Sequence, residues 1–130
     1  MPKILIVEDD PFNIELFDLI LKRLGKFDTV VTDNFEKIFE ELRSGSVDLI
    51  VMDVSLDNTY FNRKKIDGIV LSRMIKEDEQ FKNIPIIIVT AYAGDDDISR
   101  ILKESRAEQC IKKPIINYHE FIELIKGYLR

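Results

Sequence analysis

Residues 4–10 read Ile-Leu-Ile-Val-Glu-Asp-Asp, and residues 49–53 follow the same plan as Leu-Ile-Val-Met-Asp. In both stretches a continuously apolar run ends in carboxylates. Short runs with no polar alternation are typical of parallel strands that helices cover on both faces. These stretches therefore predict two buried strands of a parallel sheet, each with acidic side chains at its carboxyl end.

Three further apolar runs, at 29–31, 86–89 and more weakly 110–111, complete a set of five. Each run is followed by a stretch in which apolar residues recur at the three- and four-residue spacing of a helix. These stretches cover residues 17–24, 35–42, 67–79, 98–105 and 118–129. Strand and helix thus alternate five times. The order predicts an α/β fold with a doubly wound parallel sheet and right-handed crossovers.

Length and composition limit the class of protein. The chain has 130 residues, of which 45% are hydrophobic and 33% charged, and its net charge is −5. We expect a single domain over residues 1–130 with no output domain after it. The one basic cluster, Arg63-Lys64-Lys65, is too small to set a nucleic-acid footprint. The composition therefore argues against direct nucleic-acid binding.

The sequence also suggests a compartment. Cys110 is the only cysteine, so no internal disulfide can form. The apolar run near the start is too short for a signal peptide, and no stretch reaches the roughly 18 apolar residues of a membrane helix. We expect a cytoplasmic protein with no membrane contact.

Polar side chains follow four of the five predicted strands. They are Glu8 and Asp9 after the first, Asp53 at the end of the third, Thr90 after the fourth and Lys113 after the fifth. Open parallel sheets bind ligands outside the carboxyl ends of their strands. We therefore expect these side chains to converge from four segments of the chain.

Their chemistry fits a phosphoryl-transfer site. Crowded carboxylates favour a hard cation such as magnesium, which prefers oxygen ligands. A cation also allows a carboxylate such as Asp53 to attack a phosphoryl group, because it offsets negative charge on both. Lys113 can pair with the phosphoryl oxygens, and the Thr90 hydroxyl can donate to them.

Simpler interpretations exist for several of these residues. The acidic run Glu8-Asp9-Asp10 could cap the first helix, with Pro11 in its first turn. Both roles can coexist if Asp10 caps the helix while its two neighbours face the crevice. Asp67-Gly68 is most simply a helix start, and His119 is expected on the exposed side of the last helix.

Five motifs together resemble the receiver domain of two-component response regulators. In chain order they are Lys3-Ile-Leu-Ile-Val-Glu-Asp-Asp-Pro11, Asp48-Leu-Ile-Val-Met-Asp53, Asp67-Gly68, Ile84-Pro-Ile-Ile-Ile-Val-Thr-Ala91 and Lys113-Pro114. Each motif is weak alone, but the full set in order is specific, and it covers the whole chain. The resemblance implies a flavodoxin-like sheet with strand order 2-1-3-4-5 and five helices on both faces.

The resemblance also implies a role for each site residue. Asp53 would be the phosphoacceptor, assisted by Thr90 and Lys113, with a cis bond between Lys113 and Pro114. The metal, Mg²⁺ or Mn²⁺, would be bound directly by Asp9, by Asp53 and by the carbonyl oxygen of Ser55, and through water by Glu8.

The implied function is a phosphorylation switch rather than a conventional enzyme, although the domain would catalyse its own phosphorylation and dephosphorylation. The donor would be a histidine kinase or a histidine phosphotransfer protein, and the signal would pass to an unknown output protein by contact. One alternative is a degenerate receiver that acts as a scaffold. Another is an aspartyl-phosphate hydrolase of the haloacid dehalogenase type, which needs a second aspartate where this chain has Ser55.

The chain departs from the family pattern in two places. Ten residues, Asp57–Ile66, precede Asp67-Gly68 where the family usually has three, and Asp57 replaces a proline. We expect a polar loop, either mobile and solvated or a partner-selecting surface that uses Tyr60, Phe61 and the basic cluster. Secondly, Cys110 occupies the position of an aromatic that couples to the threonine in many receivers.

Overall fold

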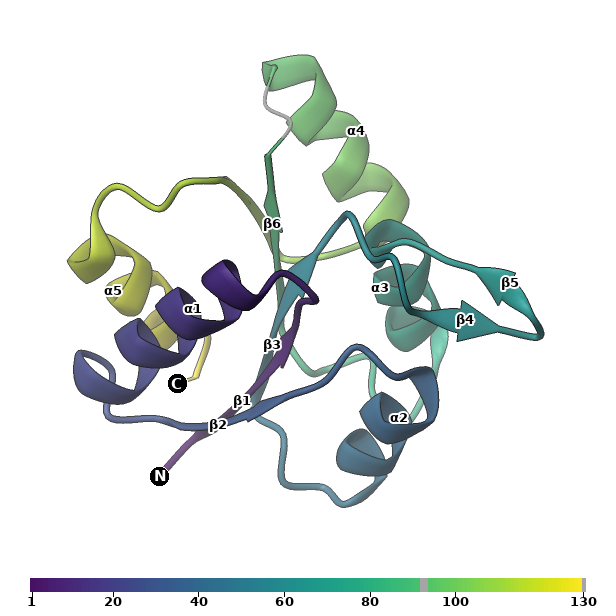
Figure 1. Ribbon diagram of the computed structural model, residues 1–130, viewed down its shortest axis with the longest axis horizontal. Helices are drawn as coiled ribbons and strands as arrows, with labels where there is room; N and C mark the ends of the chain where they lie inside the picture. Colours follow the sequence, from purple (N-terminus) through teal and green to yellow (C-terminus); the bar gives the residue numbers. More distant parts are fainter. Residues whose placement is uncertain (92–93, 130) are drawn as a thin grey trace.

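A five-stranded parallel sheet forms the centre of the molecule (Figure 1). The computed structural model describes residues 1–91 and 94–129. In chain order the strands of this sheet are β1 (Lys3–Val7), β2 (Asp28–Val31), β3 (Leu49–Asp53), β6 (Ile86–Thr90) and β7 (Gln109–Lys112). In space they follow the order β2-β1-β3-β6-β7, and every neighbouring pair is parallel. Renumbered over these five strands, that order is the predicted 2-1-3-4-5, so the predicted fold class is confirmed.

Helices cover both faces of the sheet (Figure 1). They are α1 (Pro11–Arg23), α2 (Phe35–Arg43), α3 (Gly68–Glu77), α4 (Asp95–Ser105) and α5 (Tyr118–Tyr128). Helices α1 and α5 pack on one face, and α2, α3 and α4 pack on the other. None of the helices in the described ranges is long and apolar enough to cross a membrane.

The strand β1 shows why its sequence is apolar without alternation. Ile4 and Ile6 point into the core beneath α1 and α5, whereas Leu5 and Val7 point into the core beneath α2, α3 and α4. All four side chains are fully buried. Because successive side chains of a strand face opposite sides, a strand between two helical layers has no position left for a polar residue.

Three helices start with a side-chain cap. The side chains of Asn34, Asp67 and Asn117 each accept a hydrogen bond from the amide three residues later, at 2.9–3.0 Å. Such caps satisfy amides that the helix itself leaves without a partner. Asp10 occupies the predicted capping position of α1, but its side chain does not make the capping hydrogen bond.

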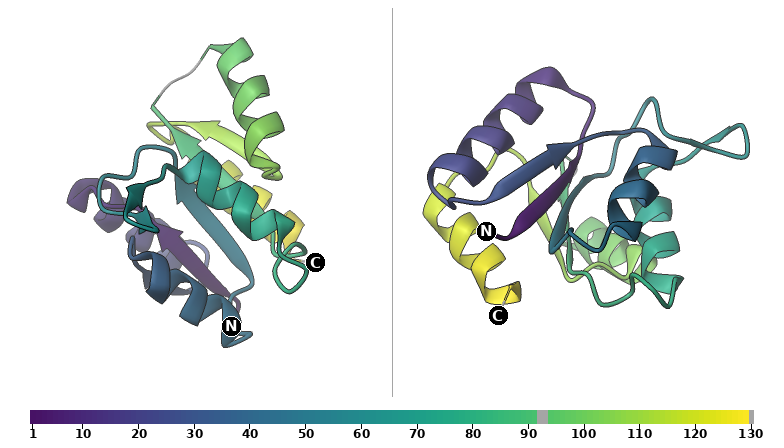
Figure 2. Two further views of the ribbon diagram at one scale, coloured as in Figure 1. Left: turned by 90° about the vertical axis from the view of Figure 1, so that its right-hand side faces the viewer. Right: turned by 90° about the horizontal axis from the view of Figure 1, so that it is seen from below.

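The inserted segment 57–66 contains a β-hairpin, where the sequence suggested only a polar loop. Strands β4 (Tyr60–Phe61) and β5 (Lys64–Lys65) pair antiparallel. The two residues between them, Asn62 and Arg63, have φ of +53° and +66°. Positive φ at both central residues is the type I′ geometry that matches strand twist. The hairpin projects from the body of the molecule beside α2 and α3 (Figures 1 and 2).

Candidate functional site

The carboxyl ends of four strands bring the predicted polar residues to one edge of the sheet. Glu8 directly follows β1, Asp53 ends β3, Thr90 ends β6 and Lys113 directly follows β7. In the parallel register Val7 pairs with Met52, and Asp53 pairs with Val89. Glu8, Asp53 and Thr90 are all at most 5% exposed. Buried carboxylates in this number require an explanation, because an unpaired buried charge is strongly unfavourable.

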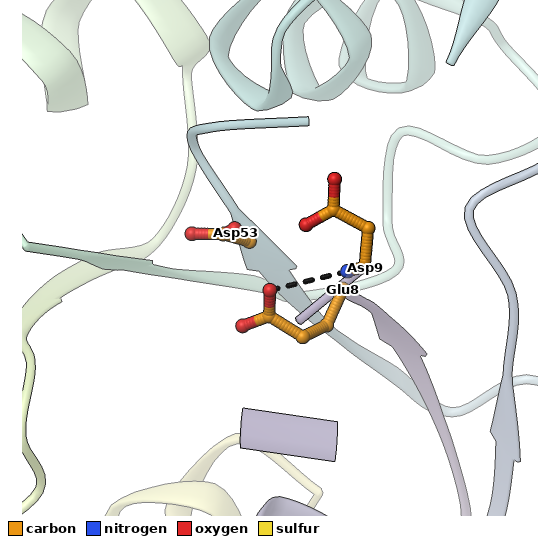
Figure 3. Close-up of side chains that lie close together, drawn as sticks. All are labelled: Glu8, Asp9 and Asp53. Atoms are coloured by element: carbon orange, nitrogen blue, oxygen red, sulfur yellow. Dashed lines mark hydrogen bonds between the residues drawn. The ribbon is translucent and has the colours of Figure 1, made fainter. Parts of the chain in front are cut away.

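Three carboxylates form a compact cluster at this edge (Figure 3). One oxygen from each of Glu8, Asp9 and Asp53 lies within 4.8 Å of the other two. The first two come from the turn after β1, and the third comes from the end of the neighbouring strand β3. Like charges at this separation repel one another, so the cluster attracts a cation.

Lys113 supplies one positive charge to the cluster. Its Nζ donates to Glu8 Oε1 and to Asp53 Oδ1, both at 2.9 Å. Its main-chain N–H donates to the carbonyl oxygen of Thr90 at 2.8 Å, and the bond from Lys113 to Pro114 is cis as expected. The backbone after β7 is thereby held against β6, with the ammonium group directed at the carboxylates.

Glu8 is held on both of its oxygens. While Oε1 accepts from Lys113, Oε2 accepts from the main-chain N–H groups of Asp9 and Asp10, at 3.1 and 3.3 Å. The carboxylate therefore fixes the turn after β1 and anchors the lysine. With both oxygens engaged, Glu8 suits contact with a metal through water better than direct ligation.

The electrostatics of Asp53 reflect this crowding. The pKa of Asp53 is raised from 3.8 to about 7: burial is the largest cause, the close contact with Glu8 adds to the rise, and Lys113 opposes it. Burial lowers the pKa of Lys113, but its hydrogen bonds to the two carboxylates outweigh this and the net shift is upward. One lysine therefore does not fully offset the negative charge.

The donor set fits magnesium. Ligand oxygens at ~2.1 Å from an octahedral Mg²⁺ lie roughly 3–4 Å from one another. Asp9 and Asp53, the two carboxylates expected to bind directly, have oxygens within 4.8 Å of each other and need only a small contraction. Within the described part of the chain, the side chain of Asp9 accepts a hydrogen bond on Oδ2 alone, from the N–H of Asp57 at 2.9 Å. Ser55, whose carbonyl is the predicted fourth protein ligand, lies exposed two residues after Asp53.

Gly68 supports the site in a way that the sequence analysis missed. Its N–H donates to the carbonyl oxygen of Val54 at 2.8 Å, so the start of α3 is drawn against the end of β3. A Cβ at this position would lie only 1.9 Å from the carbonyl oxygen of Asp53. The pair Asp67-Gly68 is a helix start, as predicted, but the glycine is needed for close approach. Only the three-dimensional contact reveals that need.

The two remaining residues singled out from the sequence lie outside the cluster. Cys110 is half-buried in β7 opposite Ile88 and packs against the core beneath α2, α3 and α4. Burial raises the pKa of its thiol. His119 is exposed on α5, as expected.

Comparison with known proteins shows the family to which this chain belongs. The sequence model of the response regulator receiver domain matches residues 4–126. The chain belongs to the response regulator receiver family. The polar-differentiation response regulator DivK of Brucella anthropi is 35% identical over 130 residues, which cover 99% of this chain and 98% of DivK. DivK of Brucella ovis is 34% identical over 126 residues, covering 97% and 94% of the two chains.

Solved structures agree with this receiver assignment. The receiver domain of a histidine kinase from Syntrophus aciditrophicus is 29% identical, with a TM-score of 0.80 over 99% of this chain and 90% of that one. The receiver domain of the sensor histidine kinase PA1611 from Pseudomonas aeruginosa, solved with a magnesium ion coordinated in its active-site cleft, has a TM-score of 0.79 at 24% identity, covering 98% and 97%. Receiver domains are phosphoacceptor switches that act with histidine kinases, phosphotransfer proteins and output proteins.

Proposed function

We propose that this receiver domain accepts a phosphoryl group on Asp53 in a magnesium-dependent reaction and signals through the resulting change in protein contacts. The observation that carries the proposal is the convergence of Glu8, Asp9, Asp53 and Lys113 at one edge of the sheet. The three carboxylates lie within 4.8 Å of one another, and Lys113 Nζ is 2.9 Å from two of them. Oxygen ligands, a buried carboxylate nucleophile and a lysine are the parts that phosphoryl transfer needs.

In the reaction an oxygen of Asp53 attacks the phosphorus of a phosphohistidine. The new P–O bond forms as the P–N bond breaks, and the electron pair leaves with the imidazole. Lys113 exchanges its contact with Asp53 for contacts with the phosphoryl oxygens, and the hydroxyl of Thr90 donates to the same group. Magnesium, when bound to Asp9, Asp53 and the Ser55 carbonyl, supplies positive charge that offsets the carboxylates and the incoming phosphoryl group.

The partners follow from membership of the receiver family. The donor is a histidine kinase or a histidine phosphotransfer protein, and the phosphorylated domain engages an output protein. Phosphorylation shifts a balance between two conformations, because the new charge pairs with Lys113 and Thr90 only after they move. The magnesium ion in the PA1611 receiver domain supports a metal site of this kind in the present chain.

Labelling with a small phosphoryl donor tests the proposal. Purified protein is incubated with acetyl phosphate, with magnesium or with a chelator, and its intact mass is measured. We expect the mass to rise by one phosphoryl group in wild type with magnesium only, and to stay unchanged in Asp53→Asn. Asp28→Asn, at the exposed start of β2, is the matched control and should label like wild type.

Two results would contradict the proposal. Label retained in Asp53→Asn at the wild-type level would place the phosphoryl group elsewhere. Absence of label in folded wild-type protein with magnesium would leave the scaffold role as the better account.

A further inference from the structure

A main-chain contact joins the inserted hairpin to the acidic cluster. The N–H of Asp57 donates to Oδ2 of Asp9 at 2.9 Å, across 48 positions of sequence. The side chain of Asp57 is exposed, and its nearest cation is Lys65 at 3.8 Å. What residue 57 contributes to Asp9 is therefore its backbone, not its carboxylate.

The base of the hairpin is fixed by a buried threonine. Thr59 is fully buried, and its Oγ1 donates to the carbonyl oxygen of Asp33 at 2.6 Å. The N–H of Ile66 closes the base by donating to the carbonyl oxygen of Thr59 at 3.0 Å. The position of residue 57, two residues before this anchor, is thereby set by the loop between β2 and α2.

The outer part of the hairpin is fixed by aromatic packing. The ring centroid of Phe61 lies 4.9 Å from that of Phe35 in the first turn of α2. The row continues from Phe35 to Phe39 at 4.8 Å and from Phe39 to Phe81 at 5.9 Å. Contacts at this separation favour one arrangement of the rings. The hairpin is thus a folded element seated on α2.

An N–H bound to one carboxylate oxygen suits a metal ligand. A carboxylate has about four acceptor positions, so Oδ2 of Asp9 can hold the amide while the second oxygen binds a cation. Hydrogen bonds from outside the ligand set fix the orientation of metal ligands, and their loss weakens metal affinity. Proline at position 57 would have no N–H to offer.

We propose that the hairpin positions Asp9 as a metal ligand through the main-chain N–H of residue 57. Residue 57 is therefore a positioning residue whose side chain is dispensable and whose N–H strengthens metal binding. The inference rests on the proposed magnesium site, and it gives the insertion a task inside that site. Its anchors, Thr59 and Phe61, act at a distance from the metal by holding the backbone of residue 57 in place.

Manganese binding to two variants tests the inference. Asp57→Pro and Asp57→Ala both remove the carboxylate, but only the proline removes the N–H, so effects of charge cancel in the comparison. Free Mn²⁺ in a titration is measured by its electron paramagnetic resonance signal. We expect Asp57→Pro to bind Mn²⁺ about ten-fold more weakly than Asp57→Ala. Equal affinities of the two variants overturn the inference and leave the metal site standing, whereas no binding by wild type overturns both.

Hydrogen exchange gives a second test that does not depend on the folding of the proline variant. In wild type the amide hydrogen of Asp57 should exchange slowly. In Asp9→Ala, which lacks the acceptor of this hydrogen bond, it should exchange at least about ten-fold faster. The amide of Ile66 is the internal control, since its acceptor is Thr59 in the same hairpin. Equal exchange of the Asp57 amide in the two proteins overturns the inference.

Discussion

Two partly buried lysines at opposite edges of the sheet have different surroundings. The amino edge is the edge of the sheet where the strands begin. There, Lys76 Nζ lies 2.6 Å from Glu108 Oε2. It also donates to the carbonyl oxygens of Lys82 and Ile84, at 3.0 and 2.9 Å. An ammonium group has three donors, and here each of them has its own acceptor. One carboxylate faces one lysine, so the cluster is balanced in charge. The charges around Lys113, at the edge where the strands end, are not balanced.

At the carboxyl edge, Lys113 donates to both Glu8 and Asp53, and Asp9 completes the group of three carboxylates. The formal charges there sum to an excess of negative charge, and burial together with the contact to Glu8 raises the pKa of Asp53 to about 7 against the opposing effect of Lys113. Burial of charge therefore has two uses in this fold. The balanced pair at Lys76 joins elements together, whereas in the proposed function the unbalanced group is completed by a cation.

Removal of the balanced lysine should have the largest effect. Lys76→Met leaves Glu108 without its cation and two carbonyl oxygens without a donor. Loss of one partner of a fully buried pair typically lowers the free energy of unfolding by about 3 kcal/mol or more. Because the Glu108 side chain is 30% exposed, we expect a smaller loss of about 2 kcal/mol here. Urea unfolding measures it. A loss within experimental error of zero would show that the amino-edge cluster does not stabilise the fold.

Removal of charge at the other edge should have the opposite sign. Asp53→Asn should raise the free energy of unfolding by about 1–2 kcal/mol at pH 8, because it removes a carboxylate that the fold keeps in an unfavourable place. Urea unfolding from pH 4 to pH 8 measures the difference between variant and wild type. A variant less stable than wild type at pH 8 would contradict the account.

The sign of the pH dependence follows from the pKa of Asp53. That pKa is raised in the folded state from 3.8 to about 7, so the protonated carboxyl contributes stability that is fully present below the unfolded pKa. This contribution is lost as pH rises through about 7. The asparagine does not titrate. Its advantage over wild type should therefore be smallest near pH 4 and should level off above about pH 7.

The sequence predicted the sheet and the carboxyl-edge cluster for clear physical reasons. A strand such as Ile4–Val7 lies between two helical layers, so all of its side chains must be apolar. The apolar run alone therefore predicts a buried parallel strand. The acidic and basic groups after the strands were expected to meet because parallel strands share one edge. Glu8, Asp53 and Lys113 do meet there, at hydrogen-bond distance.

The hairpin and the Lys76–Glu108 pair could not be predicted from the sequence. Strands of two residues are too short to show a pattern, and the turn Asn62-Arg63 lacks the glycine that usually marks this geometry. Lys76 looks like an ordinary solvated lysine of a helix until Glu108 is seen beside it. The N–H of residue 57 leaves no trace in the sequence other than the absence of proline, since every other residue type carries the same donor.

Magnesium-dependent stability tests the central claim most directly: the excess negative charge at the carboxyl edge is a cation site. Unfolding is followed with and without 10 mM magnesium, and for a dissociation constant of about 1 mM we expect wild type to gain about 1.4 kcal/mol. Lys76→Met, whose change lies at the other edge, should gain as much, and Asp9→Ala should gain nothing. A wild-type stability indifferent to magnesium, or an equal gain in Asp9→Ala, would contradict the claim.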